Sequence, residues 1–130
     1  MLCPARMLRR DTVMKDSYIA LICGSRNWTD ELKIQSWLVA NNPTAIITGD
    51  CRGADRIAFK IASRLGIDNI VYRARWDLYG KAAGPKRNLE MLAFPPDIVV
   101  AFHPNLQESK GTSHCLSAAR KLKIKTVLIT

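Results

Sequence analysis

Five short, mostly apolar runs, separated by stretches with the spacing of amphipathic helices, constrain the fold of this 130-residue chain more than any other feature. The runs cover residues 18–23, 45–48, 70–72, 97–102 and 126–129. Strands that are apolar on both faces are typical of parallel sheets covered by helices on both sides. The alternation therefore predicts an α/β fold, a Rossmann-like three-layer αβα domain around a five-stranded parallel sheet.

The expected strand order is 3-2-1-4-5. In such a sheet, ligands bind beyond the carboxyl ends of the strands, at the switch point between the first and fourth strands. The turns that reach this edge are residues 24–27, 49–53, 73–87 and 103–112, and they contain most of the glycines of the chain. The sequence therefore predicts a binding site at this edge.

Four segments have the signals of helices. The first follows Asp30, the second follows the turn 49–55, the third runs from about Pro85 to Phe94 and the fourth opens at Gly111. Residues 76–88 are too irregular for a helix or strand, and we expect them to form a loop at the centre of the site. The inward-facing helix residues are expected to be Ile34, Trp37, Leu38, Ile57, Ile61, Leu65, Cys115, Ala118, Ala119 and Leu122.

Basic residues occupy three of the four expected helix starts, where the helix dipole disfavours positive charge. Arg52 precedes the second helix, Lys86 and Arg87 lie in the expected first turn of the third, and Lys110 precedes the fourth. A phosphate bound by the backbone N–H groups and gripped by Arg87 removes this mismatch. The alternative is that the turns are glycine-rich because they are tight and that the basic residues are merely solvated.

The net charge of the chain indicates which kinds of molecule it could bind. The formal charge of +9 indicates a phosphorylated small molecule, a nucleic acid or an acidic surface. No apolar run approaches the roughly 20 residues of a membrane span, so we expect a cytoplasmic protein that does not cross a membrane. The four cysteines are scattered without a C-x-x-C pair, which predicts reduced thiols, no metal and no bound cofactor.

Residues 1–16 contain no apolar core of a secretory signal. We expect them to form a disordered leader, with Met14 as an alternative start, and residues 17–130 to form a single domain. A basic arm that binds nucleic acid is the other interpretation of this leader. The sequence leaves the oligomeric state open, a homo-oligomer included.

Five motifs next to the expected strands and helices resemble those of a known family. They read C-G-S-R-x-W at 23–28, G-x-x-x-G-A-D at 49–55, W-x-x-Y-G-x-x-A-G-P-x-R-N at 76–88, A-F at 101–102 and S-K-G-T at 109–112. They are similar to the YspA-like branch of the SLOG superfamily, whose Rossmann-like domains are related to the LOG phosphoribohydrolases and the Smf/DprA DNA-processing proteins. The resemblance covers residues 18–130. It implies a nucleotide or nucleotide-derived ligand, in sensing or in nucleotide metabolism of bacteria or phages.

The motifs also assign candidate ligand contacts. Trp76 and Tyr79 offer flat faces to a base or sugar, Arg87 offers a bidentate phosphate contact and Thr112 offers a hydroxyl at a helix start. A conventional G-x-G-x-x-G fingerprint is absent. The predicted ligand-binding residues are Gly24, Ser25, Arg26, Gly49, Gly53, Ala54, Asp55, Trp76, Tyr79, Gly80, Gly84, Arg87, Asn88, Gly111 and Thr112.

One departure from the LOG enzymes bears on catalysis. Those enzymes continue G-T-x-x-E, with the glutamate in a catalytic role, whereas Cys115 stands at that position here. LOG-type hydrolysis is therefore not expected unless Asp50, Asp55 or Asp77 substitutes. Asp55 and Asp77 are the candidate catalytic residues, with helix capping and simple solvation as their alternative roles.

Three functions follow from these observations. The first is binding of a nucleotide without turnover. The second is hydrolysis of an N-glycosidic or phosphoester bond of a nucleotide, which requires a carboxylate near the reacting atom. The third is DNA binding of the Smf/DprA kind, through the basic segment 52–64.

Overall fold

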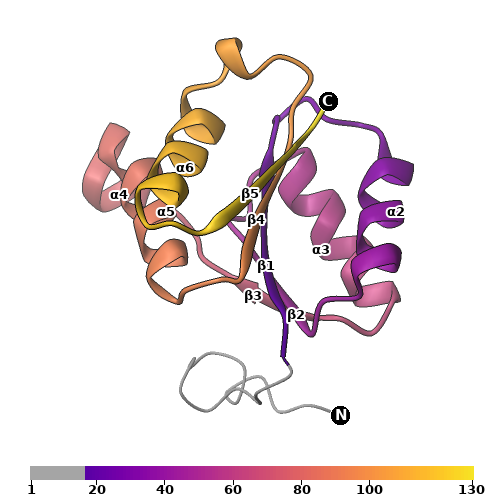
Figure 1. The fold of residues 1–130 in the computed structure, drawn as a ribbon. Coiled ribbons are helices and arrows are strands. Elements are labelled where there is room, and N and C mark those ends of the chain that lie inside the picture. Colours follow the sequence, from indigo (N-terminus) through magenta and orange to yellow (C-terminus); the bar gives the residue numbers. More distant parts are fainter. Residues whose placement is uncertain (1–16) are drawn as a thin grey trace.

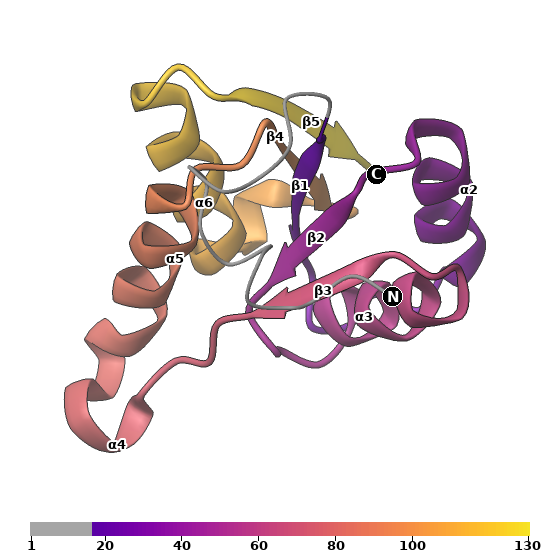
Figure 2. The same cartoon turned by 90° about the horizontal axis from the view of Figure 1, so that it is seen from below.

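The structure, a computed structural model, describes residues 17–130 and shows a parallel sheet with helices on both faces (Figures 1 and 2). The expectations for the leader 1–16 lie outside these residues. The five strands pair in the order β3-β2-β1-β4-β5, which confirms the predicted topology. Their bounds are β1 Ile19–Gly24, β2 Ala45–Thr48, β3 Asp68–Val71, β4 Ile98–Phe102 and β5 Lys125–Ile129.

The helices divide between the two faces of the sheet. Helices α2 (Glu31–Asn41) and α3 (Ala54–Arg64) cover one face, and α5 (Ala83–Ala93) and α6 (Lys110–Lys121) cover the other (Figure 1). A one-turn helix α4 (Trp76–Tyr79) and the 3-10 turns η2 (Gly80–Ala82) and η3 (Leu106–Glu108) complete the described elements. Between residues 17 and 130, no helix has the length and apolar character needed to cross a membrane.

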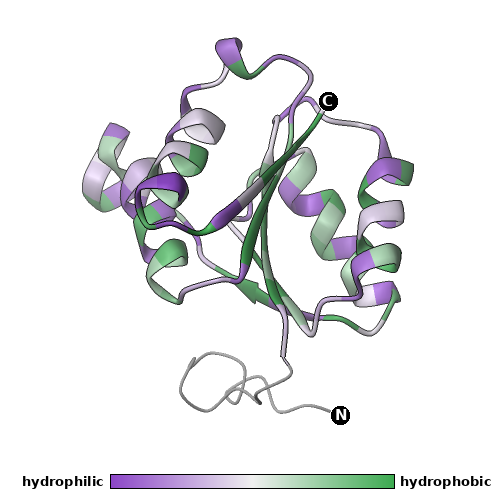
Figure 3. Ribbon diagram, in the orientation of Figure 1, coloured by the Kyte–Doolittle hydropathy of each residue, from purple (hydrophilic) through white to green (hydrophobic). Residues whose placement is uncertain are grey.

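Burial on both faces explains why the three central strands, β1, β2 and β4, are apolar, whereas the edge strands β3 and β5 include Asp68, Asn69 and Lys125 and are partly exposed. In β1, Ile19 and Leu21 pack into the core beneath α5 and α6, whereas Ala20 and Ile22 pack beneath α2 and α3. Successive residues of a strand point to opposite faces, and each of these side chains is fully buried because helices cover both faces. Figure 3 shows a largely hydrophobic sheet between helices that carry both hydrophilic and hydrophobic residues.

The segment before α5 corrects the sequence analysis. Residues 76–82 form α4 and η2, so the prediction that they are too irregular for a helix is wrong. Helix α5 starts at Ala83 rather than Pro85, because Pro85 is tolerated in the first turn, where N–H groups have no partner within the helix. Arg87 is consequently the fifth residue of α5 and lies beyond its first turn.

Two predicted inward-facing residues are also exposed. Leu65 and Leu122 are 43 % and 57 % exposed, because each caps the end of its helix, where the chain turns away from the sheet. Ala62 and Leu116, which the sequence analysis omitted, are fully buried. The prediction that both leucines face inward is therefore wrong, because it extended the apolar spacing of each helix beyond the residue at which the helix ends.

Candidate functional site

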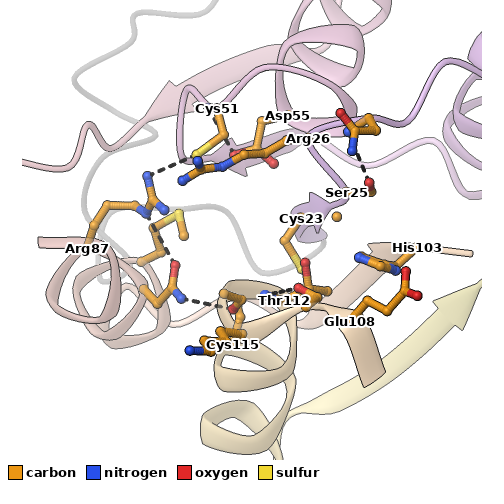
Figure 4. A pocket seen from close by; sticks show the side chains of 17 residues that line it. Cys23, Ser25, Arg26, Cys51, Asp55, Arg87, His103, Glu108, Thr112 and Cys115 are labelled. Carbon is orange, nitrogen blue, oxygen red and sulfur yellow. Dashed lines mark hydrogen bonds between the residues drawn. The ribbon is translucent and has the colours of Figure 1, made fainter. Parts of the chain in front are cut away.

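A cavity of about 380 Å³ lies at the carboxyl ends of β1 and β4 (Figure 4). This is the switch point of the sheet, where β1 continues toward α2 on one face and β4 continues toward α6 on the other. The volume falls in the lower part of the range for small-molecule sites. The cavity is lined by Cys23, Gly24, Ser25, Arg26, Asn27, Cys51, Asp55, Arg87, Asn88, Met91, His103, Glu108, Ser109, Lys110, Gly111, Thr112 and Cys115.

The turn after β1 is held against the start of α3. The Ser25 carbonyl accepts hydrogen bonds from the N–H groups of Trp28 (3.2 Å) and Ala54 (3.1 Å). Gly53 has a φ of +81°, and a Cβ at this position would clash with the Ser25 carbonyl oxygen. Gly53 and Ala54 therefore bring the Arg26 turn close to α3, and neither lines the cavity.

Asp55 fixes the adjacent turn between β2 and α3. Its Oδ2 accepts hydrogen bonds from the N–H groups of Gly49 (3.0 Å) and Cys51 (3.3 Å). The side chain is 5 % exposed, and burial raises the pKa of this carboxyl to about 6, although the two hydrogen bonds and the nearby Arg87 act in the opposite direction. Asp55 therefore has a structural task as well as a place in the cavity wall.

Arg87 is largely occupied by the protein itself. Its Nη1 donates to the Gly49 carbonyl at 2.7 Å, and its Nε donates to Asn88 Oδ1 at 3.2 Å. A Cβ at Gly49 would lie 2.7 Å from Nη1, so the glycine makes room for the guanidinium. Nη2 has no hydrogen-bond partner within residues 17–130 and is the group of Arg87 left for a ligand.

Asn88 connects this wall of the cavity to the start of α6. Its Nδ2 lies 3.3 Å from both the Gly111 carbonyl, to which it donates, and His114 Nδ1. Arg87 and Asn88 together therefore join the β2–α3 turn to α6. These neighbours in the R-N motif build the frame of the cavity.

The start of α6 forms the opposite wall. Ser109 is the N-cap, and its side chain accepts a hydrogen bond from the Thr112 N–H at 3.0 Å. Thr112 is 5 % exposed and lines the cavity, and its hydroxyl has no partner among the described residues. The partial positive charge of the helix N-terminus lies at this wall.

His103 follows β4 and is 8 % exposed at the cavity wall. Its Nδ1 accepts a hydrogen bond from the Asn105 N–H at 3.0 Å. In the neutral ring the proton therefore resides on Nε2, which can donate to a ligand. Glu108, from η3, adds a carboxylate to the same cavity.

Several predicted site residues lie elsewhere. Trp76 and Tyr79 are 50 % and 47 % exposed and do not line the cavity, because α4 projects away from the sheet (Figure 2). Gly80 lies in the same projecting segment, and Gly84 packs beside Trp76. Asp77 is an exposed residue of α4 that pairs with Arg75 at 3.3 Å, and this partner lowers the pKa of its carboxyl.

The cavity also contains residues that the sequence analysis did not assign to the site. Outside the predicted ligand-binding set are Asn27, Cys51, Met91, His103, Glu108, Ser109 and Lys110, together with the thiols of Cys23 and Cys115, which were expected only to be buried. Asn27, Cys51 and Glu108 lie in turns that were predicted to reach this edge, so their position in the chain was an available signal. Met91 had no such signal, because its direction depends on how α5 packs.

The charged groups at the cavity favour an anion. Arg26, Arg87 and Lys110 contribute positive charge together with the N-terminus of α6, against the carboxylates of Asp55 and Glu108. Arg26 and Lys110 are exposed at the mouth, whereas Arg87 is buried. No group of three or more His, Cys, Asp or Glu side chains in the described part of the chain could hold a metal ion.

The parallel sheet and its switch-point cavity place the protein in the class of Rossmann-like α/β domains. Residues 19–79 match the model of the YspA, cpYpsA-related SLOG family. The chain is also 34 % identical over 117 residues to the Gene 61 protein of Mycobacterium phage D29, across 82 % of this chain and 92 % of the phage protein. The protein belongs to the YspA/cpYpsA-related SLOG family, as its motifs suggested.

A solved structure shares the fold at much lower sequence identity. It is pantoate-beta-alanine ligase from Francisella tularensis, complexed with beta-gamma ATP and beta-alanine, with a TM-score of 0.54 and 9 % identity. The match covers 92 % of this chain but 60 % of the ligase chain. The similarity supports the fold alone.

Proposed function

We propose that the protein binds a nucleotide or a nucleotide-derived phosphorylated small molecule in the switch-point cavity, as a sensor or in nucleotide metabolism. One observation carries the proposal. The N-terminus of α6, with the buried hydroxyl of Thr112, faces a cavity whose other walls include Arg26 and Arg87.

These groups suit a phosphate. The N–H groups of Lys110 and Gly111 begin α6 and have no acceptor within the helix, whereas the Thr112 N–H is bonded to Ser109. A phosphate can accept from the two free N–H groups and from the Thr112 hydroxyl while the helix dipole stabilises its charge. Arg26 and Nη2 of Arg87 supply charge-assisted donors from the opposite side.

Family membership supports a nucleotide as the source of the phosphate, since the motif resemblance implies such a ligand. The ligase with the same fold was crystallised with beta-gamma ATP. The apolar side chain of Met91 and the backbone of Gly24 leave part of the wall without charge, which suits a sugar or base.

Thermal-shift measurements with nucleoside mono-, di- and triphosphates, nucleotide sugars and ADP-ribose test this proposal. A ligand at 100 times its dissociation constant adds about 2.7 kcal/mol to the free energy of unfolding. Thr112→Val removes the hydroxyl at nearly constant volume and should abolish most of the shift. Thr126→Val, at the start of β5 and away from the cavity lining, is the matched control.

Arg26→Ala is the second informative variant, because Arg26 is exposed and has no hydrogen-bond or ion-pair partner in the described chain. Loss of one charge-assisted contact should weaken binding by about 10- to 100-fold without lowering stability. A full ligand-induced shift in both Thr112→Val and Arg26→Ala would show that the ligand binds elsewhere. Arg87→Ala is less decisive, because it also frees the buried Gly49 carbonyl.

Hydrolysis of the bound nucleotide is a second candidate, because Glu108 and His103 place a carboxylate and an imidazole in the cavity wall. The LOG enzymes have a catalytic glutamate at the position that Cys115 occupies here. A hydrolase of this site would use Glu108 or Asp55 as its carboxylate instead. Chromatography of the nucleotides after incubation detects product. Loss of product in Glu108→Gln with unchanged binding would favour this candidate over simple binding.

A further inference from the structure

A second concave surface adjoins the cavity. It is an open groove of about 610 Å³ bounded by Arg26, Asp50, Cys51, Arg52, Arg56 and Trp76. Arg26 and Cys51 also line the switch-point cavity, so the two spaces meet at these residues. A ligand held in the cavity can therefore extend past Arg26 into the groove.

The groove carries an excess of positive charge. Its carboxylate, Asp50, is shared between Arg56 at 3.6 Å and Arg73 at 2.9 Å. Arg26 and Arg52 are exposed and form no ion pair within residues 17–130. The groove thus favours an anionic group close to its junction with the cavity.

Trp76 gives the groove a flat aromatic wall. Its side chain is half exposed, and it packs against α5 at Gly84, where a Cβ would lie 3.3 Å from the indole ring. The glycine therefore lets the indole rest close to the helix, while part of the ring remains open to the groove. A ring held in this way can stack on a base at little cost in side-chain entropy.

We propose that the groove is a second subsite and that the ligand is a dinucleotide, with two nucleosides joined by a pyrophosphate. One nucleotide occupies the switch-point cavity, the pyrophosphate passes Arg26, and the second base stacks on Trp76. This inference rests on the proposed function, because the cavity must hold the first nucleotide. It also gives Trp76 a role, although Trp76 lies outside the cavity itself.

Isothermal titration calorimetry at constant salt concentration tests the second subsite. The probes are the nucleoside monophosphates of the four bases and the corresponding symmetric dinucleoside pyrophosphates. Trp76→Ala should weaken the best dinucleotide about 5- to 150-fold and leave the monophosphate unchanged. Tyr79→Ala is the matched control, since Tyr79 is an equally exposed aromatic residue of α4 that does not line the groove.

Arg52→Ala provides an independent variant at an exposed position and should also weaken only the dinucleotide. Thr112→Val should weaken both probes. If Trp76→Ala and Arg52→Ala bind the dinucleotide as tightly as the wild-type protein and the Tyr79→Ala control do, the second subsite is overturned. Monophosphate binding, and hence the proposed function, would remain intact. If neither probe binds, the dinucleotide subsite is overturned, and the proposed function fails as well only when the wider thermal-shift panel also gives no shift.

Binding of a single-stranded tetranucleotide tests whether the groove instead holds a nucleic acid, because the basic surface runs from Arg52, in the turn before α3, to Arg56 and Lys60 on α3. Tetranucleotide binding that depends on Trp76 and Arg52 but not on Thr112 would identify the groove as a nucleic-acid surface and overturn the proposal. Steep weakening of that binding by salt would accompany this outcome. Tetranucleotide binding at least 10-fold weaker than dinucleotide binding at the same salt concentration supports the dinucleotide.

Discussion

Replacing Asp55 by Asn should change how the stability of the protein depends on pH. Burial raises the pKa of Asp55 from 3.8 to about 6 in the folded protein. The folded state therefore retains a proton that the unfolded chain loses, and the free energy of unfolding falls as pH rises from about 4 to about 6. At 1.36 kcal/mol per pKa unit, this difference of about 2.2 units corresponds to about 3 kcal/mol.

Asn removes the ionisation but can keep the local structure. Both N–H groups, of Gly49 and Cys51, donate to the same oxygen, Oδ2, so an amide oxygen in that place preserves both hydrogen bonds. We therefore expect the variant to gain about 3 kcal/mol relative to the wild-type protein between pH 4 and pH 7. Its absolute stability still changes with pH, because other groups titrate.

Urea denaturation of both proteins at pH 4, 5, 6, 7 and 8, followed by circular dichroism, measures this difference. Asp30→Asn, at the exposed N-cap of α2, gives the baseline for removing a carboxylate from a helix start. A difference between wild type and Asp55→Asn that is constant from pH 4 to pH 7 would refute the reasoning. A relative loss of stability in the variant as pH rises would show that attraction to Arg87 outweighs burial.

Three further predictions concern the frame of the site, each measured as a change in the free energy of unfolding by urea denaturation. Gly53→Ala should cost at least about 3 kcal/mol, because the position combines a positive φ with contact to a carbonyl, and a loss below 1 kcal/mol would contradict this. Leu116 is fully buried, so Leu116→Ala should lower the free energy of unfolding by about 2–5 kcal/mol, whereas Leu122 is exposed and Leu122→Ala should lower it by less than about 1 kcal/mol. Similar losses in the two variants would mean that the inward face of α6 is misassigned. Ser109→Ala should cost about 1 kcal/mol through loss of the N-cap, and an unchanged stability would remove that role.

The sequence predicted the sheet because its signals there are local and strong. A strand buried on both faces is apolar at every position, as in β1, and this pattern needs no knowledge of the neighbouring strands. The right-handed crossover rule then restricts the order of the strands. The same rules placed the turns after β1 and β4 at one edge, where the structure shows the cavity.

The cysteines and the ends of the helices were less accessible to sequence analysis. Cys115 is fully buried as expected, but its place in the cavity wall depends on how α6 packs over β1. Leu65 and Leu122 continue the apolar spacing of their helices, yet both helices end before them. Apolar spacing indicates which face of a helix is buried, but it does not indicate the residue at which the helix ends.

The sequence by itself determined the fold, the edge at which the cavity lies and the excess of positive charge there, because apolar periodicity, chain connectivity and composition act without long-range side-chain contacts. Only the tertiary structure decided what each motif residue does. Arg87 bonds to a carbonyl 38 residues earlier in the chain, and Asp55 is buried against the turn that it fixes. Trp76 lies outside the cavity because α4 projects from the sheet. These outcomes depend on how elements distant in the sequence pack together, which spacing along the chain does not specify.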